Sequence, residues 1–300
     1  MSAAQSTKKA FDPAAVVNSY PAPIAHAYAA LSESESPLEG LFALKDLFEV
    51  ALKYCAIVMV QDYLRLGMHA TPVDSALAQY LSRPQLGNWN HILREIARCS
   101  QSDREQLFVP ELADFYFELW GAPRRRGHEL VDELLKFRNR VIAHGARPRG
   151  REAEQIMAAT WPVVESFLAD LLFLPEYELF SITAEGQRLT HMGTRQSTTD
   201  SSPVSLNDNS SEHLYLHSDD AELSLFPLLL YQRCGCGTPP DLCEQQKIFF
   251  FNGGDRRPEY VDYLMGRNLR AHDGRSCQRQ ARHLSNGHRK LRPPAAHRRL

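Results

Sequence analysis

The sequence predicts an α+β protein with an all-α helical bundle, then a small β-rich unit, then a disordered basic tail. As far as residue 174, apolar residues recur at spacings of three and four, which is the period of amphipathic helices. Short apolar runs separated by turn residues follow, as in strands. From residue 266 onward neither pattern continues. We therefore divide the chain into residues 1–36, 37–174, 175–265 and 266–300.

The first segment, residues 1–36, is rich in Ala, Ser and Pro and ends in SESESP. This composition is typical of mobile segments, so we expect a flexible leader. Its two lysines are followed by no apolar run, which does not fit a secretory signal. The cysteines are scattered, and no stretch reaches about 18 uninterrupted apolar residues. These observations indicate a cytoplasmic protein with no disulfide framework and no membrane span.

The helical part begins with a long apolar segment at residues 38–67, LEGLFALKDLFEVALKYCAIVMVQDYLRLG. Because this segment is apolar on most sides of a helix, we expect it to lie in the middle of a bundle. The later helices should be antiparallel neighbours joined by short loops. They are expected at residues 73–82, 88–99, 110–120, 128–144 and 153–174.

The β-rich unit, residues 175–265, contains five runs that alternate or cluster as strands do. The segment from 194 to 212 is rich in Ser, Thr, Asp and Asn, and we expect a flexible loop there. The runs are EYELFSIT (176–183), QRLTHM (187–192), EHLYLHS (212–218), ELSLFPLLLY (222–231) and KIFFFNGG (247–254).

Arg138 occupies a position in an apolar row of the helix at 128–144, the row that runs from Val131 to Ile142. A partly desolvated guanidinium at such a position favours an anionic partner or a subunit interface. Two plainer explanations exist. The side chain could extend to water from the edge of the row, or it could pair with an acid such as Glu129 or Glu133.

His144 precedes Gly145 at the end of the same helix. A histidine in a last turn is favoured by the helix dipole and can cap carbonyl groups, so a structural role is the simpler interpretation. In a regular helix, residues 138 and 144 differ by about 240° of rotation. They could share a site only if the helix ends or tightens near Ala143, or if two copies meet in a dimer. Arg140, four residues before His144, is a rival partner.

The long apolar helix, the bundle and the helix ending in Arg-Asn, four residues and His-Gly together resemble the HEPN domain (higher eukaryotes and prokaryotes nucleotide-binding). The resemblance covers about residues 40–174. The signature of that family is an arginine, usually followed by a polar residue, with a histidine four to six residues after the arginine. Arg138, Asn139 and His144 match this signature, with five residues between the arginine and the histidine.

The resemblance implies a homodimer that brings two Arg/His sets into one cleft and cuts RNA without a metal ion, in defence or stress response. His144 would act as general base or acid. Arg138 would hold the phosphate, and Asn139 would orient the histidine or the phosphate. Other HEPN-like domains are non-catalytic modules that dimerise or bind a nucleotide or protein partner. The sequence has no phosphate-binding glycine loop, nucleophile elbow or paired-carboxylate motif, and this favours the second class.

Three cysteines, Cys234, Cys236 and Cys243, lie between two strand-like runs. Thiolates at such spacing can contribute to a structural zinc site. The usual knuckle is Cys-x-x-Cys-Gly, however, and here a single residue separates the first two cysteines. A fourth ligand would have to come from the tail, as Cys277 or His272. A degenerate knuckle or reduced loop cysteines are the alternatives. The flanking runs resemble a module that accompanies HEPN-like bundles in some bacterial proteins.

The tail is strongly basic, although the whole chain has a net charge of −2. Residues 267–300 carry nine Arg and one Lys against one Asp, a balance of +9, which leaves −11 for the rest. Such a tail would support salt-dependent binding to nucleic-acid phosphates. It contains no aromatic residue for stacking on bases. A solvated disordered end, or an out-of-frame reading of a GC-rich gene, would have the same composition.

Overall fold

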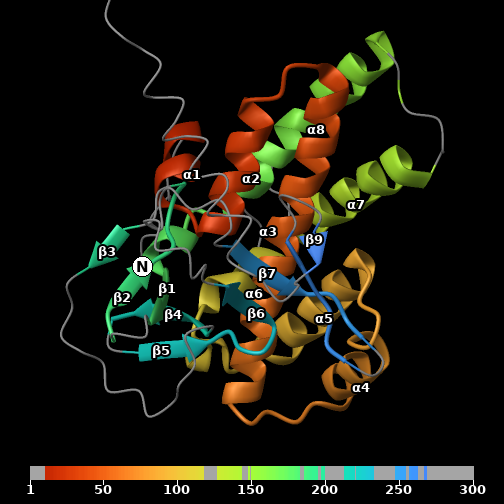
Figure 1. The fold of residues 1–300 in the computed structure, drawn as a ribbon. Helices are drawn as coiled ribbons and strands as arrows, with labels where there is room; N and C mark the ends of the chain where they lie inside the picture. The colour runs from red at the N-terminus through yellow and green to blue at the C-terminus, as the bar shows by residue number, and fades with distance from the viewer. Residues whose placement is uncertain are drawn as a thin grey trace, which may run out of the picture.

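The structure of the chain, a computed structural model, describes residues 11–117, 127–143, 148, 150–182, 186–194, 197–199, 213–219, 221–232, 247–254, 257–262 and 267–268. The fold is α+β, as the sequence predicts. Helices form the N-terminal part, and two small antiparallel sheets form the β-rich C-terminal part (Figure 1).

The helices that the sequence predicts are all present, with ends that differ by a few residues. Two short 3-10 turns, Arg104–Gln106 and Leu174–Glu176, follow α5 and α8. The described residues contain the α-helices α1 (Pro13–Ser19), α2 (Ala22–Ser32), α3 (Pro37–Arg65), α4 (Thr71–Tyr80), α5 (Leu86–Cys99), α6 (Pro110–Phe117), α7 (Gly127–Ala143) and α8 (Arg151–Asp170).

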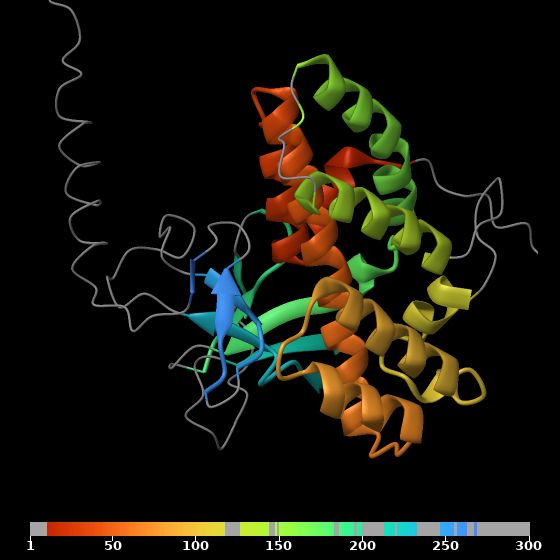
Figure 2. The ribbon, with the colours of Figure 1, turned by 90° about the vertical axis from the view of Figure 1, so that its right-hand side faces the viewer.

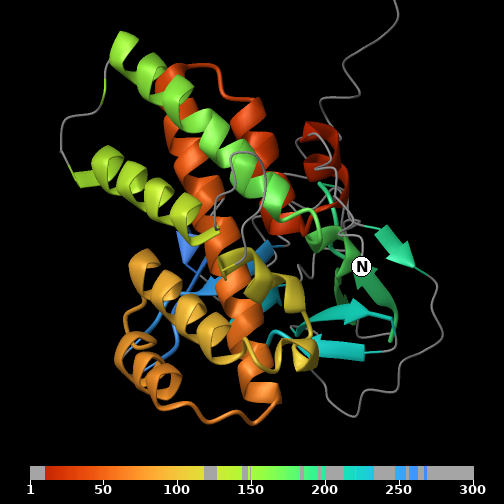
Figure 3. The ribbon, with the colours of Figure 1, turned by 180° about the vertical axis from the view of Figure 1, so that it is seen from behind.

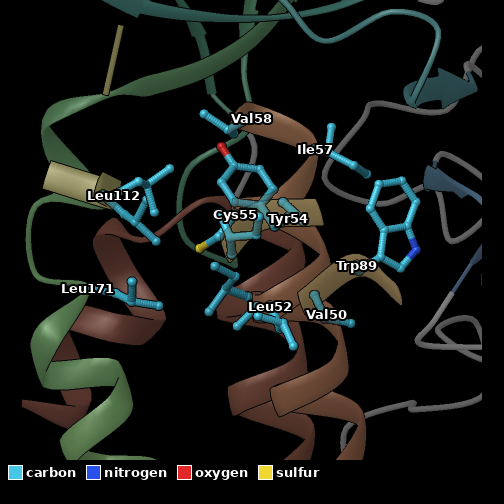
Figure 4. Close-up of a cluster of buried hydrophobic side chains, with 14 of the residues drawn as sticks. Val50, Leu52, Tyr54, Cys55, Ile57, Val58, Trp89, Leu112 and Leu171 are labelled. Carbon is cyan, nitrogen blue, oxygen red and sulfur yellow. The ribbon is translucent and has the colours of Figure 1, made fainter. Parts of the chain in front are cut away.

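Helix α3 lies in the middle of the molecule, with helices and sheets packed around it (Figures 2 and 3). It begins where Ser36 accepts a hydrogen bond from the N–H of Glu39, an N-cap that SESESP provides. Every side chain from Val50 to Tyr63 is buried. Figure 4 shows apolar side chains on different sides of this helix, with Trp89 of α5 on one side and Leu112 of α6 on the other. The expectation of a central helix is confirmed.

The prediction of a flexible leader is wrong for residues 13–32, which form α1 and α2. Helix α2 packs along α3, and its apolar residues are buried. The apolar stripe was present in the sequence at spacings of four, four and three. The prolines that begin these two helices are also typical of linkers, so composition alone predicts a mobile segment. The stripe consists of Tyr20, Ile24, Tyr28 and Leu31.

This N-terminal segment ties α8 to the first sheet. The Tyr20 hydroxyl donates to the carbonyl of Leu168 at 2.8 Å, and the N–H of Ala22 donates to the carbonyl of His191 at 2.8 Å. The N–H of Gly193 donates back to the carbonyl of Tyr20 at 2.7 Å. A Cβ on Gly193 would lie 2.6 Å from the carbonyl oxygen of Asn18, so the close approach requires glycine there.

The first sheet has the strand order β3-β2-β1-β4-β5, and the second has the order β6-β7-β8-β9. All paired strands are antiparallel, as expected of hairpins. The strands are β1 (Glu178–Ile182), β2 (Arg188–Thr190), β3 (Ser197–Thr199), β4 (Leu214–Ser218), β5 (Ala221–Ser224), β6 (Leu229–Gln232), β7 (Lys247–Phe251), β8 (Tyr260–Asp262) and β9 (Arg267–Asn268).

Each predicted strand-like run contains strand residues, but the run at 222–231 divides into two strands of different sheets. Pro227 lies between them and cannot donate to a ladder. Three strands, β3, β8 and β9, belong to none of the predicted runs, because they are too short to show a period. Strand β8 follows the last predicted run within the β-rich unit. Strand β3 lies in the expected loop at 194–212, and β9 lies in the expected tail at 266–300. The remainder of both segments lies outside the described residues, except for Thr194.

Both sheets contact the helical part through backbone as well as side chains. The side chain of Gln61 on α3 donates to the carbonyl of Leu225, which follows β5, at 3.4 Å. The turn after β7 packs against the loop between α4 and α5, where the N–H of Gly254 donates to the carbonyl of Ser82 at 2.8 Å. The neighbouring Gly253 approaches the same loop, and a Cβ there would lie 2.4 Å from the Ser82 oxygen.

One segment, residues 151–176, is long and apolar enough to span a membrane by length and composition, although the sequence analysis expected no such segment. In the structure, the buried side chains of its helix include Val164, Phe167 and Leu168, and α8 packs against α3 and α7. The core helix of a soluble bundle has the same properties.

The Tyr20 contacts predict that residues 13–32 contribute to stability. We expect Tyr20→Phe to lower the free energy of unfolding by ~1 kcal/mol, because the buried carbonyl of Leu168 loses its donor. Tyr20→Ala should cost ~3–5 kcal/mol, because it also leaves a cavity beside α3 and α8. Urea unfolding followed by circular dichroism measures both. A value for Tyr20→Ala within about 0.5 kcal/mol of the wild type would mean that this segment is only loosely attached.

His191 lies in the core between the two sheets and is fully buried. Its Nε2 is 2.9 Å from the hydroxyl of Ser181, and its ring centroid is 4.5 Å from that of Tyr231 on β6. Burial lowers the pKa of His191 from 6.5 to about 3. The neutral imidazole is therefore the form that the folded core accepts.

This depressed pKa predicts a loss of stability in acid. Between pH 6.5 and about 3, the unfolded chain binds a proton at His191 that the folded chain does not bind. The free energy of unfolding should therefore fall as the pH falls through this window, with a slope from this group of up to about 1.4 kcal/mol per pH unit. In His191→Gln that part of the slope should disappear. Parallel pH profiles for the two proteins would show that His191 is not the group responsible.

Candidate functional site

Helix α7 places the Arg–Asn pair of the motif against the middle of the bundle. Its buried residues Leu130, Val131 and Leu134 face the core, and the helix packs against α8, α6 and α3. The helix begins close to α6. A Cβ on Gly127 would lie 2.4 Å from the carbonyl oxygen of Phe115, so only glycine allows this approach. Figure 3 shows α7 passing next to α3.

Arg138 is partly buried, with 29% of its side chain exposed, and its Nε donates to Oε1 of Glu49 on α3 at 2.8 Å. The prediction that Arg138 pairs with an acidic side chain is confirmed. The suggested acids Glu129 and Glu133 are wrong, because the partner lies 89 positions away in the sequence on another helix. This ion pair fastens α7 to α3 and fixes the plane of the guanidinium.

Asn139 is exposed, and its side-chain oxygen accepts a hydrogen bond from Nη1 of Arg138 at 3.1 Å. The guanidinium is therefore held by two groups, a carboxylate through Nε and an amide through Nη1. The Nη2 group takes part in neither bond. Arg140, the rival partner of His144, is exposed on the same helix. The surface around Arg138 thus carries an amide, whereas Arg140, two positions further on, points about 200° away around the helix.

His144 lies outside the described residues, as do 145–147. Whether the histidine approaches Arg138 or Arg140 is therefore untested, and its catalytic assignment stays a prediction. Of the three motif residues, the structure describes the arginine and the asparagine as direct neighbours.

Glu49 is the residue that the sequence analysis missed. Its side chain is 12% exposed, and the ammonium of Lys45, one turn earlier on α3, lies 3.6 Å from its second oxygen. Lys45 also pairs closely with Asp46. Burial raises the pKa of the Asp46 carboxyl, and the pairing with Lys45 offsets only part of this increase. A signal existed in the sequence, because Lys45, Glu49 and Lys53 recur every four residues within a predominantly apolar helix.

Lys53 continues this row into the core, where its side chain is 1% exposed. The ammonium lies 5.6 Å from the ring centroid of Trp89 on α5 and 6.0 Å from that of Phe250 on β7. Burial lowers the pKa of Lys53 from 10.5 to about 7, and the negative charge of Glu49 acts in the opposite direction. Aromatic faces attract a desolvated cation, so the site tolerates either form of the amine near neutral pH.

The cysteines proposed for zinc, Cys234, Cys236 and Cys243, lie outside the described residues, and so do Cys277 and His272. Among the residues that the structure does describe, no group of three or more His, Cys, Asp or Glu side chains is arranged to hold a metal ion. The structural zinc therefore stays a prediction. The basic tail beyond residue 268 is likewise outside the described part of the chain.

Comparisons with protein-family models, with curated proteins and with solved structures give no match for this chain.

The Arg138–Glu49 contact predicts different effects for two arginines on one helix. Arg138→Gln should lower the free energy of unfolding by ~1–3 kcal/mol, because a largely buried carboxylate loses a charged hydrogen-bond donor. Arg140→Gln, a matched change at an exposed position, should stay within about 0.5 kcal/mol of the wild type. Equal effects in urea unfolding would mean that Arg138 does not fasten α7 to α3.

Proposed function

We propose that the chain is a metal-independent endoribonuclease of HEPN type that acts as a homodimer in the cytoplasm, in defence or stress response. The proposal rests on the motif of Arg138, Asn139 and His144. The observation that supports it is the geometry of Arg138. Its guanidinium is partly exposed and is held in one orientation by Glu49 and Asn139. A catalytic arginine benefits from such orientation, because no free energy is then spent on ordering it during the reaction.

In this reaction the ribose 2′-oxygen attacks the adjacent phosphorus, and the bond from phosphorus to the 5′-oxygen breaks. The products are a 2′,3′-cyclic phosphate and a 5′-hydroxyl. His144 takes the proton from the 2′-hydroxyl, or gives a proton to the leaving 5′-oxygen, so two copies in a dimer would supply both roles. Arg138 would offset the negative charge that grows on the phosphate oxygens.

A second candidate function is a non-catalytic module that dimerises or binds a nucleotide or protein partner. The observation that favours it is the same ion pair. Glu49 offsets the charge of Arg138 and fastens it between two helices, which is what a purely structural arginine does. Arg138 could therefore serve the bundle alone.

Cleavage of RNA distinguishes the two functions. Mixed-sequence single-stranded RNA would be incubated with the protein in EDTA, and 2′,3′-cyclic phosphate ends would be measured by mass spectrometry. We expect His144→Ala to slow cleavage by ~10²–10⁴-fold, the usual contribution of a general acid or base. Arg138→Lys should also lose activity, because lysine keeps the charge but lacks the planar fork that contacts two phosphate oxygens.

Lys136→Gln, at an exposed cation of α7 that has no assigned part in the site, is the matched control and should cleave like the wild type. Light scattering would verify that every variant keeps the oligomeric state of the wild type. Equal cleavage by wild type and His144→Ala, or no cleavage by any of them, would reject the ribonuclease and leave the interaction module.

A further inference from the structure

The ion pair of Arg138 is one part of a charged network that joins α3 to α7. Oε1 of Glu49 accepts the hydrogen bond from Nε of Arg138 at 2.8 Å, and Oε2 of Glu49 lies 3.6 Å from the ammonium of Lys45. Lys45 also pairs with Asp46, its neighbour on α3. The two oxygens of Glu49 are therefore each paired with a cation, one from its own helix and one from α7.

Lys45 limits how the Glu49 carboxylate can turn. The terminal torsion of a glutamate is broad, so a carboxylate that is held at one oxygen rotates over a wide range. The side chains of Glu49 and Lys45 are only 12% and 14% exposed, and ionic attraction is stronger at such sites than in water. An ammonium next to Oε2 therefore keeps Oε1 directed towards Arg138. Asp46, by contrast, is 41% exposed, so water can replace Lys45 there.

The direction of the Glu49 carboxylate fixes the edge that Arg138 presents. Nε of Arg138 donates to Glu49, and Nη1 donates to Asn139 at 3.1 Å. A guanidinium is planar, so fixing Nε also fixes the direction of the edge between Nη1 and Nη2. An edge with two parallel N–H groups matches two oxygens of one phosphate. A Glu49 carboxylate that turned would therefore turn this edge with it.

We propose that Lys45 is a positioning residue for Arg138, which acts through Glu49 and fixes the edge that the guanidinium presents to a phosphodiester. The catalytic meaning of this inference rests on the proposed function, whereas the positioning itself does not. Removal of the Lys45 charge should loosen the hydrogen bond between Glu49 and Arg138. A network without positioning would give the opposite result, because Glu49 would attract its remaining cation more strongly.

Exchange of the Arg138 Nε–H with water tests the positioning directly. The protein would be labelled with ¹⁵N-arginine, and the Nε–H signal of Arg138 would be assigned by its loss in Arg138→Lys. NMR would then measure the exchange rate at one fixed pH in the wild type and in Lys45→Met, in which methionine keeps the length of the lysine stem. We expect exchange to be ~2–5-fold faster in Lys45→Met, the change that corresponds to one weak ion pair.

Three further variants complete this measurement. Lys45→Gln repeats the loss of charge with a different neutral side chain, whereas Lys45→Arg keeps the charge and should exchange like the wild type. Lys136→Gln, at an exposed cation of α7, should also exchange like the wild type. Equal or slower exchange in both neutral variants of Lys45 overturns the inference, whatever the RNA assay gives.

The RNA assay separates this inference from the proposed function. Faster exchange in a protein that cleaves no RNA supports the positioning and rejects the ribonuclease. In a protein that cleaves RNA, Lys45→Met should lower kcat more than it changes KM, because Arg138 acts on the charge that grows in the transition state. Lys45→Arg should restore kcat. An unchanged kcat in Lys45→Met would overturn the catalytic part of the inference.

Discussion

The burial of α3 is the constraint from which the rest of the structure follows. From Val50 to Tyr63 this helix has no side that faces water, so each of its faces needs a cover. Helices α2, α5, α7 and α8 and strand β5 supply it. Apolar area removed from water contributes about 25 cal/mol per Å², so an uncovered face would lose stability in proportion to the apolar area that it exposes. The N-terminal helices and the β-rich part are therefore parts of one core.

Polar groups on this helix decide which element covers which face, because a buried polar group needs its partner in one place. Asp62 is fully buried and accepts hydrogen bonds from Arg65 and from the backbone of Phe108, which fixes the segment before α6. Gln61 holds the carbonyl of Leu225 after β5. Glu49 holds α7 through Arg138. The burial of these groups costs solvation, and their bonds offset that cost only in the observed arrangement.

The candidate site is therefore built into the scaffold. Arg138 reaches Glu49 because α7 crosses α3 at that turn, and the same row of charges continues to Lys53 under the second sheet. An arginine in such a position can orient a phosphate or can simply hold two helices together. Under the proposed function, the difference lies in what His144 and a second copy of the chain bring to it.

The class of fold and six of the helices were predictable from the sequence. Apolar residues that recur every three or four positions, as in residues 38–67, indicate the local geometry of a helix. The strands were predictable for the same reason, except for the short β3, β8 and β9, which contain too few residues to show a period. Helix α2 could have been found from the spacing of Ile24, Tyr28 and Leu31, whereas α1 ends before this stripe begins. Only the tertiary structure could decide that Glu49 is the partner of Arg138 and that Phe250 covers Lys53. Arg138 and Glu49 are 89 positions apart in the sequence, and Phe250 and Lys53 are almost two hundred positions apart. Local periodicity carries no information about which distant residues will meet.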